Sequence, residues 1–260
     1  MPIEVFVLGS GSAGNSALVR AEGTTILVDA GMSARKIEER IRHLGVEIAD
    51  IDGILLTHEH GDHTAALKVL QRKRATPVYA NSMTARTLGG HVPAGSWRLF
   101  ESGNRFQIGA LSISTFRVPH DAVDPVGFRI SCQGSCFGIL TDLGHATRPV
   151  LDALRGVQGL LIETNYDEQL LQLDTRRPWS VKQRISSRHG HLSNAAAAKV
   201  LEELSAEELR MVILAHLSRD CNKPELAITA IRDCLQRTGR GHTQVTCAEQ
   251  DPVSFSLCLC

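Results

Sequence analysis

The sequence predicts a mixed α/β domain in which two packed β-sheets are covered by helices on each side. Apolar, strand-like runs occur in both halves of the chain, and stretches with helical periodicity stand before, between and after them. No linker, low-complexity tract or internal repeat interrupts the 260 residues. A chain of this length can bury a sizeable core, so we expect one domain over residues 1–260.

In the first half of the chain, short strands alternate with helices. Ser33 suits the N-cap of a helix, and Gly45 suits its end. The strands expected here are Ile3 to Leu8, Leu18-Val19 paired with Thr25 to Val28, Ile54 to Leu56, and Val78-Tyr79. The helices expected here are Ala34 to Leu44, about His63 to Arg74, and Ser82 to Leu88.

The second half begins with consecutive strands, after which strands and helices alternate again. The expected strands are Ile113 to Val118, Gly127 to Ser131, Phe137 to Leu140, Gly159 to Ile162 and Met211 to Leu214. The expected helices are Ala195 to Leu204 and Glu225 to Leu235. Val245 and the run from Phe255 to Leu259 are expected to be closing edge strands.

Composition excludes a global attraction to nucleic acid. Lys+Arg and Asp+Glu both number 28, so the formal net charge is zero and any such attraction must come from a local patch. The seven cysteines form no framework spacing, which favours reduced thiols in a cytosolic protein. A zinc-binding role for Cys132 and Cys136 is a less favoured alternative, because no second cysteine pair stands near them; Cys258 and Cys260 close the chain.

No targeting or membrane segment is expected. The start of the chain, Met1-Pro-Ile-Glu4, lacks a basic region followed by a long apolar run. No stretch of about 18 apolar residues occurs that could span a bilayer as a helix. We therefore expect a cytoplasmic protein, and the oligomeric state stays open.

The most informative motif is a cluster of three imidazoles and a carboxylate within six residues: His58, His60, Asp62 and His63. In an extended segment, His58 and His60 project to the same side. A turn at Gly61 then lets Asp62 and His63 point to a second, adjacent position. These groups bind zinc, manganese or iron, so the motif predicts two metal ions. A helix-capping turn would explain Asp62 but none of the histidines.

Three further ligand candidates each follow an apolar strand directly. They are His120, Asp142 and His216. Each alone could be a helix cap or a surface loop residue. Three such residues at strand ends favour a shared metal site, because loops on a rigid scaffold carry chemistry.

Taken together, these motifs resemble the metallo-β-lactamase superfamily. The residues that match its ligand motifs in order and kind are Asp29, His58, His60, Asp62, His63, His120, Asp142 and His216. The resemblance spans Ile3 to about Arg219 and implies a four-layer αββα sandwich. It implies that His58, His60 and His120 hold one ion, that Asp62, His63 and His216 hold the other, and that Asp142 bridges them. Asp29 would orient the ligand loop.

Later motifs narrow the resemblance. Gly190-His-Leu-Ser-Asn194 and His216-Leu-Ser-Arg219 are similar to two motifs of ribonuclease Z, the first of which supplies a proton-shuttling histidine. With the glycine-rich Gly9–Asn15 run and Glu163-x-Asn-Tyr-Asp167, they resemble the YycJ/WalJ-type group, whose members are described as DNA exonucleases. Class B β-lactamases instead are secreted and often carry a cysteine where this chain has Asp142.

A basic run precedes the expected catalytic histidine, His191. Residues 175–191 contain five Lys/Arg residues and no acid, and four of them are our candidate phosphate contacts: Arg176, Lys182, Arg184 and Arg188. The alternative is a solvated helix face. Trp179 lies within the run, where it either stacks on a base or packs under the helix. The run from Lys68 to Arg74 is expected to be the exposed face of its own helix.

The sequence therefore predicts a phosphodiesterase with two divalent metal ions, zinc first and manganese or iron as alternatives. Its substrate would be nucleic acid, DNA rather than RNA, cleaved as by an exonuclease. Asp62 would orient the attacking water or accept its proton, His191 would protonate the leaving oxygen, and Glu163, on a neighbouring loop, would orient His191. The alternatives are a thioester or small cyclic-phosphate hydrolase and, from another class, a metal-bound regulator without turnover.

The glycine-rich run Gly9–Asn15 supports neither of two other chemistries. It lacks the lysine of a P-loop and the helix pattern that should follow one. No Gly-x-Ser-x-Gly elbow is followed by a helix, which excludes a serine nucleophile of that type. Ser10, Ser12 and Asn15 are expected in a tight connection near the rim of the site, within reach of substrate.

Overall fold

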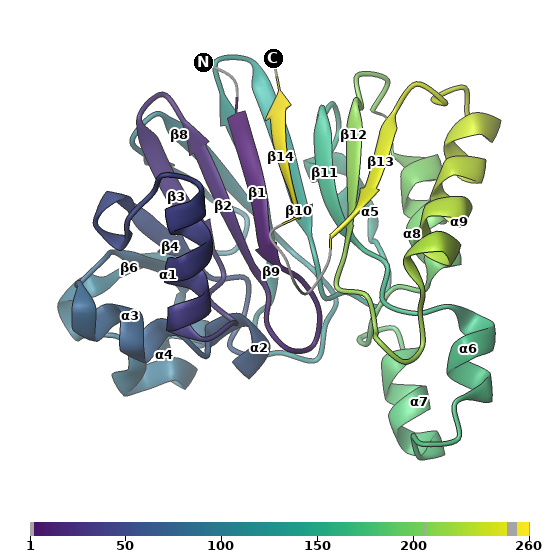
Figure 1. Ribbon diagram of the computed structural model, residues 1–260, viewed down its shortest axis with the longest axis horizontal. Coiled ribbons are helices and arrows are strands. Elements are labelled where there is room, and N and C mark those ends of the chain that lie inside the picture. The colour runs from purple at the N-terminus through teal and green to yellow at the C-terminus, as the bar shows by residue number, and fades with distance from the viewer. Residues whose placement is uncertain (1–2, 205, 249–253, 260) are drawn as a thin grey trace.

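Two seven-stranded sheets lie face to face in the computed structural model, which describes residues 3–204, 206–248 and 254–259 (Figure 1). Helices cover the outer face of each sheet, so the architecture is the predicted αββα sandwich. No helix among the described residues is long and apolar enough to cross a membrane.

The first sheet contains both ends of the described chain. Its strands are β1 (Ile3–Gly9), β2 (Ser16–Ala21), β3 (Thr24–Val28), β4 (Gly53–Leu55), β5 (Val78–Asn81), β6 (Trp97–Phe100) and β14 (Ser254–Leu259). Their order is β14-β1-β2-β3-β4-β5-β6. The pairs from β14 to β3 are antiparallel, and those from β3 to β6 are parallel. The predicted hairpin is confirmed, with Val19 opposite Ile26.

The second sheet repeats this plan. Its strands are β7 (Arg105–Ile108), β8 (Leu111–Arg117), β9 (Val126–Cys132), β10 (Ser135–Leu140), β11 (Gly159–Glu163), β12 (Met211–Ala215) and β13 (Gln244–Cys247). Their order is β13-β12-β11-β10-β9-β8-β7. The pairs from β7 to β10 are antiparallel and those from β10 to β13 are parallel. The carboxyl ends of β10, β11 and β12 therefore share one edge.

Three apolar layers hold the sandwich together. Successive side chains of a strand point to opposite faces: Val5 and Val7 of β1 pack between the sheets, whereas Phe6 and Leu8 pack under helices. The helices over the first sheet are α1 (Ala34–His43), α3 (Leu67–Lys73) and α4 (Ser82–Leu88). Those over the second are α5 (Arg148–Ala153), α8 (Asn194–Glu203) and α9 (Pro224–Arg237).

Three helices lie at the site end of the molecule. α2 (Gly61–Thr64) is a single turn within the ligand motif, and α6 (Glu168–Leu173) and α7 (Trp179–Ile185) project from the body (Figure 1). Short 3₁₀ turns occur at Ile48–Asp50, Gly89–His91 and Ala94–Ser96.

Most predicted elements are confirmed within one or two residues. Ser33 caps α1, accepting a hydrogen bond from the Lys36 amide, and β13 and β14 are edge strands as expected. The helix expected from His63 to Arg74 is instead two short helices. α2 ends at Thr64, and α3 begins at Leu67. The sequence does not predict β6, since its central residues Arg98 and Leu99 are both exposed and give no alternation.

Candidate metal centre

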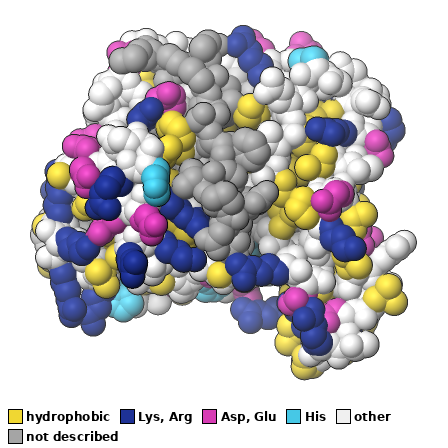
Figure 2. Space-filling model, viewed as in Figure 1, with side chains coloured by type: hydrophobic (Ala, Val, Ile, Leu, Met, Phe, Trp, Pro, Cys, Tyr) yellow, Lys and Arg dark blue, Asp and Glu magenta, His cyan; other side chains and the backbone are white. Residues whose placement is uncertain are grey.

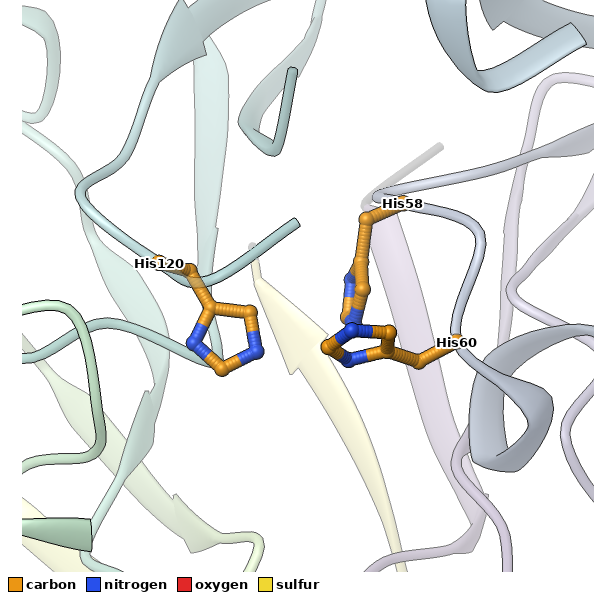
Figure 3. A group of neighbouring side chains, drawn as sticks. All are labelled: His58, His60 and His120. Carbon is orange, nitrogen blue, oxygen red and sulfur yellow. The ribbon is translucent and has the colours of Figure 1, made fainter. Parts of the chain in front are cut away.

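The ligand candidates gather where strands of both sheets end. His58 and His60 follow β4 of the first sheet, whereas His120 follows β8 of the second. Their rings point toward one another, with centroids 4.5 Å apart for His58–His60 and 5.2 Å for each of the other two pairs (Figure 3). One nitrogen from each lies within 4.8 Å of the others. The structure thus brings the three predicted ligands of one ion together.

A second group lies beside the first. One ligand atom each of Asp62, His63 and His216 fall within 4.8 Å of one another. Asp142 lies between the groups: its Oδ2 is 3.0 Å from His63 Nε2, and its Oδ1 is 3.8 Å from His120 Nε2. This is the position expected of a bridging carboxylate.

Three residues of the site leave their strands in a left-handed conformation. Asp29, Asp142 and His216 have φ values of 59°, 55° and 56°. Such values are uncommon outside glycine and are several-fold enriched for Asp and His. They turn the chain sharply at the rim, and strain of this kind clusters at functional sites.

The buried nitrogens of the site fit a metal ion. The Nε2 atoms of His58, His120 and His216 are buried and have no hydrogen-bond partner among the described residues. An unpaired buried polar atom is costly, and three of them facing carboxylates form a donor set that suits zinc, manganese or iron. The residues present therefore fit the implied ions.

Asp29 contacts the ligand loop. Its Oδ2 lies 2.8 Å from His63 Nδ1, and its Oδ1 accepts a hydrogen bond from the Thr57 amide at 2.9 Å. This leaves His63 Nε2 for the metal side. Gly31 is required nearby, because a Cβ there would lie 1.6 Å from the Asp62 carbonyl oxygen.

The glycine-rich connection contacts the site more closely than the sequence indicated. The Ser10 hydroxyl accepts a hydrogen bond from the His216 amide at 2.6 Å. The Asn15 amide nitrogen lies 3.1 Å from His63 Nε2 and 3.3 Å from Asp62 Oδ2. Ser12 lines the cavity over the ligands.

Glu163 holds two histidines, not one. Its Oε1 lies 2.7 Å from His191 Nδ1 and 2.7 Å from His216 Nδ1. Its Oε2 accepts hydrogen bonds from the Leu143 and Leu192 amides. Glu163 is completely buried and is the last residue of β11, whereas we expected it on a loop; the strand fixes it more firmly.

Burial and neighbouring charges shift the pKa values of histidines in the site. Burial lowers the pKa of His58 well below its ordinary value, and the neighbouring His63 lowers it further. Burial would also lower the pKa of His216, but Asp142, Asp62 and Glu163 outweigh it and raise that pKa to about 10. His216 thus holds a proton in the metal-free protein. A cation that replaces this proton will make metal binding depend on pH.

Arg184 alone among the predicted phosphate contacts lines the cavity, which measures about 190 Å³. Its Nε lies 2.5 Å from Oδ2 of Asp121, for which the sequence predicted no role. Arg176 is instead paired with Asp220 at 2.6 Å. Residues 175–191 contain no acid, but Arg184 and Arg176 pair with acids from other segments, Asp121 and Asp220.

Two smaller interpretations are also decided. Trp179 is 69% exposed, so the hypothesis that it packs under the helix is wrong. Cys132 and Cys136 are buried and free, and no group of three potential ligands in the described part of the chain includes either. The side chain of Cys258 and all of Cys260 lie outside the described residues.

Comparison with known proteins assigns the family. The model of the Beta-lactamase superfamily domain matches residues 24–216. The chain belongs to this superfamily. Exodeoxyribonuclease YycJ of Bacillus anthracis is 34% identical over 244 residues, covering 93% of this chain and 92% of the relative. Exodeoxyribonuclease WalJ of Streptococcus pneumoniae is 35% identical over 226 residues, covering 85% and 84%.

Solved structures agree on the fold. The metallo-β-lactamase fold protein YhfI from Bacillus subtilis superposes with a TM-score of 0.75 at 17% identity, covering 98% of this chain and all of that one. Together with the full-length relatives, this superfamily membership makes the chain a metal-dependent hydrolase.

Proposed function

We propose that this superfamily member is a phosphodiesterase with two divalent metal ions that hydrolyses DNA from a strand end. The observation that carries the proposal is the Glu163–His191 pair, which stands in the same cavity as the two ligand groups. Neither residue is needed to bind a first ion at His58, His60 and His120. Relatives named exodeoxyribonucleases, aligned over most of both chains, supply the substrate class.

The two ligand groups would hold the ions. His58, His60 and His120 suit the first, whereas Asp62, His63 and His216 suit the second, with Asp142 between them. Bound there, two divalent cations supply Lewis-acid activation of water and neutralise charge on phosphoryl oxygens.

His191 is the proton donor to the leaving oxygen. Its Nδ1 is engaged by Glu163, so Nε2 is the nitrogen available to the cavity. Burial would lower the pKa of His191, but the Glu163 carboxylate outweighs it and raises that pKa, which favours the imidazolium form. As the bond from phosphorus to the leaving oxygen breaks, Nε2 gives that oxygen its proton.

Asp62 acts on the opposite side of the reaction. Its carboxylate lines the cavity, and its side chain is 27% exposed, so it can contact a water molecule there. It orients the attacking water and takes up a proton as the new bond from oxygen to phosphorus forms.

The alternative hydrolases leave features unexplained. A thioester or small cyclic-phosphate hydrolase would use the same ligands but would have no use for the projecting α7 with Lys182 and Arg184. A regulator without turnover would not explain why Glu163 holds His191 Nδ1 at 2.7 Å beside the cavity, outside the group formed by His58, His60 and His120.

The test is a direct assay on matched substrates. Metal-loaded protein is incubated with DNA labelled at the 5′ or the 3′ end, with RNA of the same sequence, and with bis-para-nitrophenyl phosphate. We expect stepwise release of nucleotides from DNA, slower attack on RNA, and no release after chelation. Hydrolysis of the small ester without cleavage of either polymer would contradict the proposal and favour the small-substrate alternative.

A further inference from the structure

The projecting helix α7 has two different faces. Val181, Arg184 and Ile185 line the cavity of the metal centre. Trp179, Lys182, Gln183 and Ser186 instead line a second groove of about 320 Å³, together with residues of α6 such as Leu171 and Gln172. The spacings i, i+3, i+4 and i+7 place each set on one side of a helix. A single helix therefore separates the metal cavity from the second groove.

α7 is a ridge rather than a packed helix. None of its residues is buried, and Trp179 and Val181 expose 69% and 39% of their surface. The two least exposed, Lys182 and Ile185, mark the side toward the body. At 100° per residue, Ser180, Gln183 and Arg184 then lie along the outer crest, between the cavity and Trp179.

Charge on this ridge suits a polyanion. α7 carries Lys182 and Arg184 and no acid, and Arg184 pairs with Asp121 from another segment. The Lys182 ammonium donates to the Gln172 carbonyl oxygen at 2.7 Å and has no carboxylate partner among the described residues. The carboxylate lining the groove, Glu168, accepts a hydrogen bond from the Ser193 hydroxyl. Figure 2 shows hydrophobic, basic and acidic side chains side by side on the projection formed by α6 and α7.

We propose that α7 guides a single strand of polynucleotide into the metal cavity, with one base stacked on Trp179. The backbone would cross the crest beside Arg184. The base would enter the groove, which Gln183 and Lys182 line. This rests on the proposed function and deepens it, because it makes the substrate single-stranded near the cleaved bond.

The width of α7 limits which nucleotide can stack on Trp179, and the stacking itself requires an unpaired base. A helix is about 10–12 Å across, and even a fully stacked strand advances about 3.4 Å per nucleotide. The stacked base thus lies no more than about three nucleotides from the cleaved phosphate. The paired bases of an intact duplex are not free to stack on a side chain, so the strand must be unpaired where it meets Trp179.

Tryptophan fluorescence tests the contact without catalysis. The chain has two tryptophans, so Trp97→Phe leaves Trp179 as the only emitter. Chelated protein is titrated with oligothymidylate, with the same strand carrying one abasic site at successive positions from its end, and with a blunt duplex. We expect quenching by the intact strand, its loss when one of the first three positions is abasic, and weaker quenching by the blunt duplex. Quenching equal for intact and abasic strands would overturn the proposal.

A pair of variants supplies the second measurement. Trp179→Ala should weaken binding of the single strand by about 5- to 150-fold, the usual effect of one stacked base. Leu173→Ala is the matched control, because Leu173 is 75% exposed on α6 and does not line the groove. Equal affinities of the two variants would contradict the guide role. If Trp97→Phe unfolds, subtracting the signal of Trp179→Phe from the wild type gives the same readout.

The outcomes separate this inference from the proposed function. DNA cleavage by metal-loaded protein, with no response of Trp179 to any strand, would overturn the guide alone. If neither cleavage nor binding of any strand occurs, both proposals fail, and the ridge is better explained as a protein-binding surface.

Discussion

The metal centre and the α6–α7 projection lie side by side but are built in opposite ways. In the metal centre, Asp142, Glu163 and His216 are almost completely buried, and each is held by strand ends and hydrogen bonds. In the projection, α7 has no buried residue, and its charges lie at the surface. The first region is preorganised for chemistry, whereas the second can adapt to a flexible partner. We therefore expect the two regions to respond differently to substitution.

The largest effect should come from removing a ligand. His60→Ala and Asp62→Ala should reduce DNA cleavage to the level of chelated protein. Both side chains are partly exposed at the rim, so the free energy of unfolding of metal-free protein should change by only about 0.5 kcal/mol. Cleavage assays with denaturant titration check this. Near-native turnover in either variant would rule out the mechanism.

His191→Ala should have the next largest effect, on the rate rather than on binding. Loss of the proton donor should slow DNA cleavage by about 10²- to 10⁴-fold. Para-nitrophenolate leaves without a proton, so hydrolysis of its phosphodiester should slow much less. Comparing the two rates in one preparation is the measurement; equal losses would mean that His191 has another role.

Glu163→Gln should weaken metal binding through the histidines that Glu163 contacts. It keeps the shape but removes the charge that holds His191 and His216, so affinity for the second ion should fall by about 10- to 100-fold. Competition with a colourimetric chelator measures it. Glu168→Gln is the control, since Glu168 binds Ser193 outside the centre; the same loss there would indicate a general charge effect.

The smallest effect should come from basic residues on α7 and in the segment that follows it. Replacing Lys182 and Arg188 by Gln should lower the slope of log affinity against log salt by about 0.7 for each phosphate of single-stranded DNA that the variant no longer neutralises. Arg176→Gln is the matched control, because Arg176 is already paired with Asp220. Binding measured at several salt concentrations decides. A slope that falls only with Arg176→Gln would reverse our assignment.

The same contrast explains what could be predicted from sequence. The gathering of the candidate ligands was predictable because their segments follow apolar strands, and parallel strands deliver such residues to one edge. The contact of Glu163 with His216 could not be predicted, because it depends on the side-by-side packing of β11 and β12. Nor could the pairing of Arg176 with Asp220 and of Arg184 with Asp121, since those acids come from distant segments.

The central claim is that two ions in this site cleave DNA, and a metal titration tests it most directly. Chelated protein receives zinc or manganese in steps, while bound metal per chain and nucleotide release from end-labelled DNA are measured together. We predict that release rises until about two ions are bound per chain, in line with two ligand groups and a bridging carboxylate. Full activity at one ion per chain, or no release from DNA at any loading, would contradict the account.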